Sequence, residues 1–213
     1  MVKNYKKSGT ERLSDNFDSA EFDCHGAGCC DTTKIDTVLV EMLQRIRNHF
    51  GRPIVINSGY RCSSHNKAVG GASGSRHLKG QAADIVVSGT APAEVAKYAE
   101  HMGVKGIGLY GNFVHVDTRT VKSFWKTALE TPAKTFGGTN PHSKPSANIG
   151  NGSRGAGVKW LQWELNFFGY DCGGVDGLFG MRTRAALRRF QSDKGLQVDG
   201  ICGQKTKAKL AEV

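Results

Sequence analysis

The sequence predicts an α+β domain with an antiparallel sheet, followed by a small three-helix module at the carboxyl-terminal end. Before residue 127, short apolar runs of strand character alternate with two helical stretches. A stretch rich in Pro, Gly, Thr, Ser and Asn follows, and beyond it a short motif occurs twice, each time ahead of a helix. We therefore expect a domain at 1–127, a flexible linker at 128–151 and a second domain at 152–213.

The composition is that of an ordinary globular protein. Of the 213 residues, 38% are hydrophobic and 23% are charged, which excludes a disordered chain as a whole. The formal net charge of +10 attracts polyanions, a class that includes nucleic acid, anionic lipid and the teichoic-acid-bearing bacterial wall. Charge alone does not choose among these partners.

The amino-terminal stretch 1–10 is basic but has no apolar core of a signal peptide behind it. No apolar run in the sequence approaches the length of a membrane span. We therefore expect a protein that is made in the cytoplasm without a signal peptide and that does not insert into membranes.

The first long element is a helix predicted over 31–50. Asp31 is the expected N-cap and Gly51 the expected end. The apolar residues at helical spacing, which we expect to face the core, are Ile35, Val38, Leu39, Met42 and Ile46.

The remaining elements of the first domain follow from local patterns. A second helix is expected from about residue 90, with Pro92 in its first turn, to Gly103. Gly111-Asn112 is a typical two-residue hairpin connection. The expected strands and loop are, in chain order, a strand at 53–57, a glycine-rich loop at 70–74, and strands at 82–87, 106–110 and 113–119.

The second domain contains an internal repeat. Val175–Leu187 and Val198–Leu210 both begin with V-D-G, continue with an apolar residue and Gly, and then enter a helix. A third helix is predicted at 158–168. Within it, Trp160 and Trp163 can stack on sugar rings, although at least one such Trp is usually a core residue.

Three side chains in the first domain form a candidate metal site. His77, Asp84 and His115 are two imidazoles and a carboxylate, a set that leaves a fourth tetrahedral position for water, as in catalytic zinc sites. The first pair is not the HExxH arrangement on one helix, because Gly80 interrupts and a short buried strand opens near Asp84.

These motifs resemble the zinc D-alanyl-D-alanine carboxypeptidases and L-alanyl-D-glutamate endopeptidases that cut peptidoglycan stem peptides. The family signature S-x-H-x-x-G-x-A-x-D is matched from Ser75 to Asp84, preceded by S-G-Y-R at 58–61 and followed by a strand that ends in His115. The resemblance covers roughly residues 15 to 125. It implies zinc as cofactor, with His77, Asp84 and His115 as ligands.

The resemblance also implies roles around the metal. Arg61 is expected to hold or polarise the substrate, or else to form a structural salt bridge, and Ser75 and Tyr110 are expected to bind substrate. Many relatives carry an acid three positions before the last histidine, where this chain has Asn112. Asp117 shares a strand face with His115 and is our candidate general base; the alternative is that it orients a zinc-bound histidine.

The six cysteines leave several possibilities open. Cys24, Cys29 and Cys30 could form a metal knuckle with Cys62, but the spacing fits no standard zinc signature. Disulfides and buried free thiols are the alternatives, and free thiols are the commonest outcome in the cytoplasm. The other two cysteines, Cys172 and Cys202, could form a disulfide with each other.

The carboxyl-terminal repeat resembles the peptidoglycan-binding module of many wall hydrolases. Together the two resemblances imply a monomeric, endolysin-like bacteriolytic metallopeptidase that binds peptidoglycan, not nucleic acid, and reaches the wall after release from the cytoplasm, as in phage lysis. The terminal module favours an endopeptidase acting on the polymer. The alternatives are a carboxypeptidase that trims stem peptides, and a catalytically inactive wall-binding protein with structural zinc.

Overall fold

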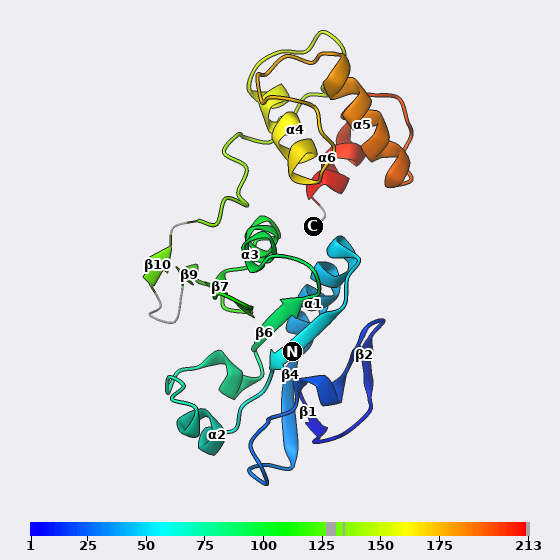
Figure 1. Cartoon of the computed structure of the whole chain (residues 1–213). Helices are drawn as coiled ribbons and strands as arrows, with labels where there is room; N and C mark the ends of the chain where they lie inside the picture. The colour runs from blue at the N-terminus through cyan, green and yellow to red at the C-terminus, as the bar shows by residue number, and fades with distance from the viewer. Residues whose placement is uncertain (127–130, 134, 212–213) are drawn as a thin grey trace. The chain divides into compact units, whose positions relative to one another are not determined.

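The computed structural model describes residues 1–126, 131–133 and 135–211. The chain forms two compact units, Met1–Gly137 and Gly138–Val213 (Figure 1). The division falls inside the stretch that composition marks as linker, whereas the expected boundary at 127/128 lies outside the described residues.

The first unit is built on a six-stranded sheet with the order β10-β9-β7-β8-β6-β5, antiparallel except for the parallel pair β7–β9. Its strands are β5 (Ile54–Ser58), β6 (Ala82–Val87), β7 (Gly106–Leu109), β8 (Val114–Asp117), β9 (Ser123–Lys126) and β10 (Thr131–Ala133). Two small antiparallel sheets pair β1 (Val2–Lys6) with β4 (Thr32–Asp36), and β2 (Arg12–Ser14) with β3 (Phe17–Asp18). The helices are α1 (Thr37–Phe50), α2 (Ser63–Ala68) and α3 (Pro92–His101), with 3-10 turns η1 (Ser19–Phe22) and η2 (Arg76–Lys79).

Helices α1 and α3 contact each other and pack on one face of the sheet, α1 against β6 and α3 against β7 and β8 (Figure 1). Because side chains alternate along a strand, Ile85 and Val116 point into this helix-covered core and are buried. Asp84 and His115, one residue before each, therefore belong to the opposite face. They are direct partners across the β6–β8 pair.

Helix α1 begins later than its apolar pattern predicts. Its N-cap is Asp36, whose side chain accepts a hydrogen bond from the backbone of Val38 (3.3 Å), and not Asp31. The residues before Asp36 are drawn into β4 by pairing with β1, a distant contact that helical spacing cannot reveal. Val38, expected in the core, is 48% exposed, and Val40 and Leu43 are buried in α1 instead. The predicted end is confirmed, because Gly51 adopts the left-handed conformation at φ 60°.

Most of the other expected elements of the first unit are confirmed. The strands expected at 53–57 and 82–87 correspond to β5 and β6, and the helix beginning at Pro92 is α3. The hairpin closes at Gly111-Asn112, where the backbone N–H of Tyr110 donates to Phe113 (3.1 Å). The short α2 and the strand β9 were not predicted.

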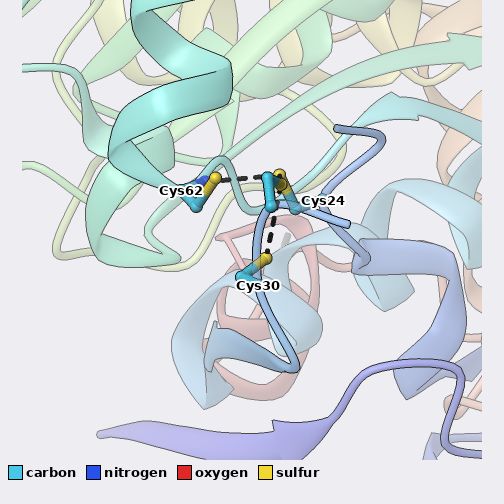
Figure 2. A group of neighbouring side chains, drawn as sticks. Cys24, Cys30 and Cys62 are labelled. Atoms are coloured by element: carbon cyan, nitrogen blue, oxygen red, sulfur yellow. Dashed lines mark hydrogen bonds between the residues drawn. The ribbon is translucent and has the colours of Figure 1, made fainter. Parts of the chain in front are cut away.

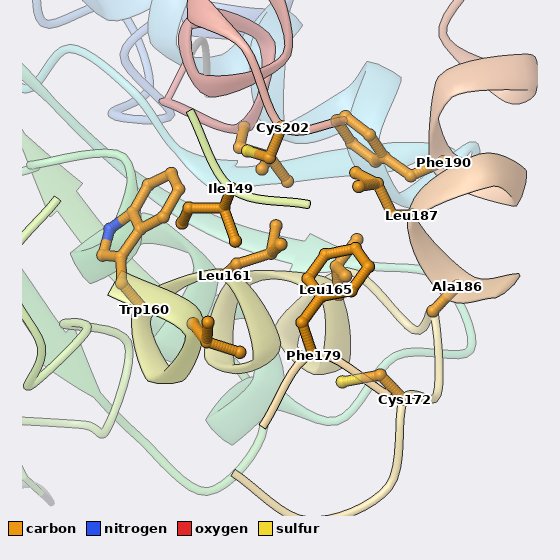
Figure 3. Close-up of a cluster of buried hydrophobic side chains, with 12 residues drawn as sticks. Ile149, Trp160, Leu161, Leu165, Cys172, Phe179, Ala186, Leu187, Phe190 and Cys202 are labelled. Atoms are coloured by element: carbon orange, nitrogen blue, oxygen red, sulfur yellow. The ribbon is translucent and has the colours of Figure 1, made fainter. Parts of the chain in front are cut away.

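The second unit contains α4 (Ala156–Phe167), α5 (Met181–Asp193) and α6 (Gln204–Ala211) around an apolar cluster (Figure 3). Trp160 belongs to this cluster and is 4% exposed, whereas Trp163 is half-buried and stacks on Phe167. Cys172 and Cys202 are buried free thiols at opposite sides of the cluster, so the disulfide considered for them does not form (Figure 3).

A buried glutamine closes each copy of the internal repeat. Gln162 Nε2 donates to Asp176 Oδ1 (2.8 Å) and to Thr183 Oγ1 (3.2 Å), while its Oε1 accepts from the backbone of Gly177 (2.8 Å). In the second copy, the equivalent contacts of Gln191 are to Asp199 (2.8 Å), Thr206 (3.3 Å) and Gly200 (2.9 Å). The V-D-G turn of each copy is therefore fixed by a side chain that lies outside the motif.

The end of the stretch expected as linker is packed onto the second unit. Ile149 is 4% exposed within the apolar cluster and pairs with Cys202 in a β-bridge. Lys207, 1% exposed, donates from its Nζ to three backbone carbonyls in 145–147, at 3.2, 2.7 and 3.2 Å. Residues 145–149 thus belong to the structure of the second unit.

Candidate metal centre

Three predicted ligand residues converge on the sheet face opposite α1 and α3. His115 Nδ1 lies 2.8 Å from Asp84 Oδ1 and 3.2 Å from His77 Nε2, and the last two atoms are 3.3 Å apart. All three residues are buried, with exposed fractions of 3 to 8%. Asp84 and His115 come from adjacent strands, whereas His77 is placed by the turn η2, so residues separated by 38 positions meet at one point.

Hydrogen bonds on the far side of each imidazole fix which nitrogen faces this point. His77 Nδ1 lies 2.6 Å from the carbonyl of Gly59, which can only accept, so Nδ1 carries the proton and Nε2 has a free lone pair. His115 Nε2 lies 3.1 Å from Asp117 Oδ2, so its Nδ1 is the nitrogen with the free lone pair. Both lone pairs point toward the Asp84 carboxylate.

Three acceptor atoms that face one another need a cation between them. Two imidazole nitrogens and one carboxylate oxygen are a donor set that zinc accepts, and a set of three protein ligands is typical of catalytic zinc. The outer hydrogen bonds also match the way metal-bound histidines are held in proteins. The residues present therefore fit a zinc ion.

The charge states of the carboxylates suit the same role. Burial would raise the pKa of Asp84, but its contacts with the imidazoles of His115 and His77 hold it well below its usual range. Asp84 is thus an anion at neutral pH, as a metal ligand must be.

Arg61 is tied to the ligand Asp84. Its Nη2 lies 2.6 Å from Asp84 Oδ2, and its Nε donates to Ser58 Oγ (2.8 Å). The structure therefore contains the salt bridge considered as the alternative to substrate binding. Arg61 also lines the pocket above the ligands, so one guanidinium can serve both purposes.

Asp117 lies behind His115, on the side of the ring away from the ligand atoms, and is fully buried. The guanidinium of Arg119 binds it from the other side, with Nε–Oδ1 and Nη2–Oδ2 distances of 2.8 and 2.6 Å. Burial would raise the pKa of Asp117, but the hydrogen bonds from His115 and Arg119 lower it. Gly106 leaves the room for this carboxylate, because a Cβ there would lie 2.1 Å from Asp117 Oδ1. This geometry favours the orienting role over that of general base.

A pocket of about 360 Å³ opens over the ligands. Trp125 forms one wall, with its ring centroid 5.1 Å from that of His115 and its Nε1 donating to the Tyr110 hydroxyl (3.0 Å). Gly108 makes this possible, since a Cβ there would lie 2.5 Å from the Trp125 ring. Ser75 lines the pocket and accepts a hydrogen bond from the backbone of His77 (3.3 Å), which caps η2.

Sequence reasoning missed three residues of this pocket: Trp125, Arg119 and Arg76. Trp125 reaches the site through the parallel β7–β9 pairing, which no local pattern announces. Arg119 lies two residues after Asp117, just beyond the end of β8, and this spacing was the available signal for the ion pair. Among the described residues that line the pocket, Asp84 is the sole carboxylate.

Comparison with known proteins identifies both parts of the chain. Residues 15–117 match the family Peptidase M15, and residues 154–210 match the family named "Putative peptidoglycan binding domain". The chain joins an M15 peptidase domain to a peptidoglycan-binding domain. The M15 match contains His77, Asp84 and His115, and the second match contains both copies of the repeat.

Curated relatives match parts of the chain. The spore cortex-lytic enzyme of Oceanobacillus iheyensis is 44% identical over 64 residues, which are 30% of this chain and 23% of that protein. The peptidoglycan L,D-endopeptidase MepK of Escherichia coli is 38% identical over 93 residues, covering 39% of this chain and 51% of MepK. The chain thus spans between about a quarter and a half of the length of these relatives.

Among solved structures, the SleB N-terminal domain is 43% identical to this chain, with a TM-score of 0.32. The match covers 33% of this chain and 96% of the SleB domain.

Within the part of the chain that the structure describes, no helix combines the length and apolarity needed to cross a bilayer.

Proposed function

We propose that this protein is a zinc-dependent peptidoglycan hydrolase that cuts a peptide bond in the stem peptide or cross-link of the bacterial wall. The observation that carries the proposal is the convergence of His77 Nε2, Asp84 Oδ1 and His115 Nδ1 at the floor of an open pocket. The match to Peptidase M15 over the same residues supports it.

Zinc bound there would supply Lewis-acid polarisation of a carbonyl and a hydroxide nucleophile at neutral pH. The protein's own residues would hold the ligand set: Gly59 fixes the ring of His77, Asp117 fixes that of His115, and Arg61 fixes the Asp84 carboxylate. Since each ligand is held by an outer partner, little reorganisation would be needed on binding.

The pocket suits an acidic peptide. Three arginines line it, and Asp84 is the only carboxylate among its described lining residues. Arg61 and Arg119 are each bound to an aspartate, whereas Arg76 has Gln81 as its partner, with Nη1 2.9 Å from Oε1. We propose that Arg76 binds a carboxylate of the stem peptide, with Tyr110 and Trp125 as an apolar wall and Ser75 at the rim.

The bond that is cut is proposed to be an internal one. MepK, named as an L,D-endopeptidase, is 38% identical over part of this chain, which favours an endopeptidase over a carboxypeptidase. The second unit would act as the wall anchor, as a small three-helix peptidoglycan-binding module in a monomeric enzyme. Action on the wall after release from the cytoplasm completes this proposal.

Neither position considered for the general base offers an acid to the pocket. Asn112 occupies the position at which many relatives carry an acid, and Asp117 is enclosed by His115 and Arg119. The Tyr110 hydroxyl, which accepts a hydrogen bond from Trp125, lies in the pocket lining. We propose it as the polar group that positions the leaving amine.

A turnover assay on purified peptidoglycan, with and without a chelator, tests the function. Released peptides analysed by mass spectrometry should show internal stem-peptide cleavage, which the chelator abolishes and added zinc restores. Asp84→Ala should be inactive, and Arg52→Gln, at an exposed position outside the pocket, should behave as the parent. Binding of walls without any product release would instead support the inactive wall-binding alternative.

A further inference from the structure

Four cysteines gather at a second place in the first unit, and none of them lines the pocket. Cys24, Cys29, Cys30 and Cys62 each place a sulfur so that all four lie within 4.8 Å of one another. Three of them come from 23–31, a loop without helix or strand, and Cys62 is the N-cap of α2. Figure 2 shows the side chains of Cys24, Cys30 and Cys62 directed toward a common centre from these two segments.

The spacing of the sulfurs is that of a tetrahedral metal site. With zinc–sulfur bonds of about 2.3 Å, neighbouring sulfurs of a tetrahedron lie about 3.8 Å apart. The Cys24–Cys29 and Cys29–Cys30 sulfur distances are 3.4 and 3.7 Å. A disulfide needs about 2.05 Å between its sulfurs, and all four thiols are free.

The polar surroundings also suit bound thiolates better than packed thiols. Cys24 Sγ accepts a hydrogen bond from the backbone of Cys62 (3.3 Å) and lies 3.2 Å from His65 Nδ1. Cys62 Sγ accepts from the backbone of His65 (3.4 Å). Such N–H···S contacts stabilise negative sulfur ligands. Cys29 and Cys30 are only partly buried, so the cluster is not an ordinary piece of hydrophobic core.

The loop is folded tightly around the sulfurs. A Cβ at Gly26 would lie 2.5 Å from Cys29 Sγ and 2.9 Å from the Cβ of His65, so this position must be glycine for the loop to close. Four residues separate Cys24 from Cys29, a spacing that structural zinc sites use. The adjacency of Cys29 and Cys30, by contrast, matches no standard signature, which hid the site from the sequence pattern.

We infer that Cys24, Cys29, Cys30 and Cys62 form a structural zinc site with four thiolate ligands. A closed set of four protein ligands leaves no position for water, so this site would stabilise the fold and take no part in hydrolysis. It would be distinct from the histidine–aspartate centre in both ligand type and role.

The four-cysteine site would also stabilise the candidate metal centre. The segment 59–62 joins the two, since the carbonyl of Gly59 holds His77 (2.6 Å) and Arg61 holds Asp84 (2.6 Å). Beside it, the backbone of Tyr60 donates to Phe22 (2.8 Å), two residues before Cys24. Metal binding at the cysteines would thus fix the position of both outer partners.

Metal content of the full chain, purified under reductant, tests the inference. We expect about two zinc ions per chain, about one in Asp84→Ala, and about one in the double variant Cys29→Ser/Cys30→Ser. Cys172→Ser, which changes a buried thiol in the other unit, is the matched control and should keep both. Cobalt substitution of Asp84→Ala should give the near-ultraviolet thiolate-to-cobalt band that four-sulfur sites show.

The Asp84→Ala protein keeps the test decisive even if the cysteine variant fails to fold. Asp84→Ala without zinc and without the cobalt band overturns the inference. So does a count of fewer than six free thiols in the denatured, unreduced and chelated protein, because it would show disulfides instead. If the unsubstituted chain binds zinc at the cysteines but hydrolyses no stem peptide, the proposed enzyme is wrong and the cysteine site still stands.

Discussion

His115 Nε2 lies 3.1 Å from Asp117 Oδ2, on the side of the imidazole ring opposite the atoms that His115 shares with His77 and Asp84. Asp117 therefore acts on the ring rather than on a group in the pocket. We propose it as a positioning residue, and its removal should then have a signature that differs from loss of a general base.

Asp117→Asn should weaken zinc binding by about 10–100-fold, because the outer hydrogen bond that fixes the His115 ring loses its charge. Turnover should return toward the parent value when zinc is raised. Competition with a chromophoric chelator gives the affinity, and stem-peptide hydrolysis gives the rate. Unchanged affinity together with a loss of turnover by about 10²–10⁴-fold at saturating zinc would restore Asp117 as the general base.

Arg76→Gln should raise KM about tenfold with kcat and zinc content unchanged, as expected when about 1.4 kcal/mol of substrate binding is lost. We expect this effect because Arg76 lines the pocket and has no carboxylate partner among the described contacts, so its charge is available to the substrate. Steady-state kinetics on a soluble stem peptide measure the effect. A matched loss in Arg52→Gln, outside the pocket, would show that net charge rather than this contact is responsible.

Glu164 should make the second unit less stable as the pH rises from about 4.5 to 7. Burial, opposed by a hydrogen bond from Asn140, raises its pKa to about 7. In that window the folded chain holds a proton that the unfolded chain has lost, so unfolding releases it and the free energy of unfolding falls with pH. The effect is at most about 3 kcal/mol.

Thermal unfolding of the second unit across this range, compared with Glu164→Gln, isolates the contribution. The variant should lose the decline and be the more stable form above pH 7. Asp193→Asn, which removes an exposed carboxylate of the second unit at the end of α5, serves as the control. Parallel pH profiles for the parent and Glu164→Gln would place the source of the decline elsewhere.

Gln191→Leu should destabilise the second unit by about 1–3 kcal/mol, because the buried Gly200 N–H and Thr206 hydroxyl lose the side chain that satisfies them, and the exposed Asp199 loses a donor. Gln162→Leu should act alike in the first copy. Urea unfolding measures both, with the exposed Gln197→Leu as control. If the buried and the exposed substitutions lower the free energy of unfolding equally, the glutamines do not fix the turns.

The three candidate ligand residues could be selected from the sequence because each lies in a local motif whose spacing is meaningful. His77 and Asp84 lie in one ten-residue stretch, 75–84, and His115 ends a hairpin strand with a recognisable turn. The pocket wall could not be predicted in the same way. Trp125 reaches His115 only because β9 pairs in parallel with β7, and that register is a product of the folded sheet.

Long-range pairing also explains the misplaced start of α1. The pattern from Ile35 to Ile46 is compatible with a continuous helix, and only the partner strand β1 converts its first residues into β4. The contacts of the two closing glutamines could not be predicted for a related reason. Each lies well before its V-D-G turn, so the repeat shows the turn but not the side chain that fixes it.

Lys207 puts a positive charge inside the second unit without a carboxylate beside it in the described contacts: its ammonium donors go to the carbonyl oxygens of 145–147. The cation that these carbonyl oxygens bind is thus a side chain of the protein itself. Dissolved salt cannot replace it, because it is covalently attached. A fragment that starts after residue 147 would keep the buried ammonium group of Lys207 but lose the carbonyl oxygens that accept its hydrogen bonds. The practical amino-terminal boundary for handling this unit alone therefore lies before Pro145.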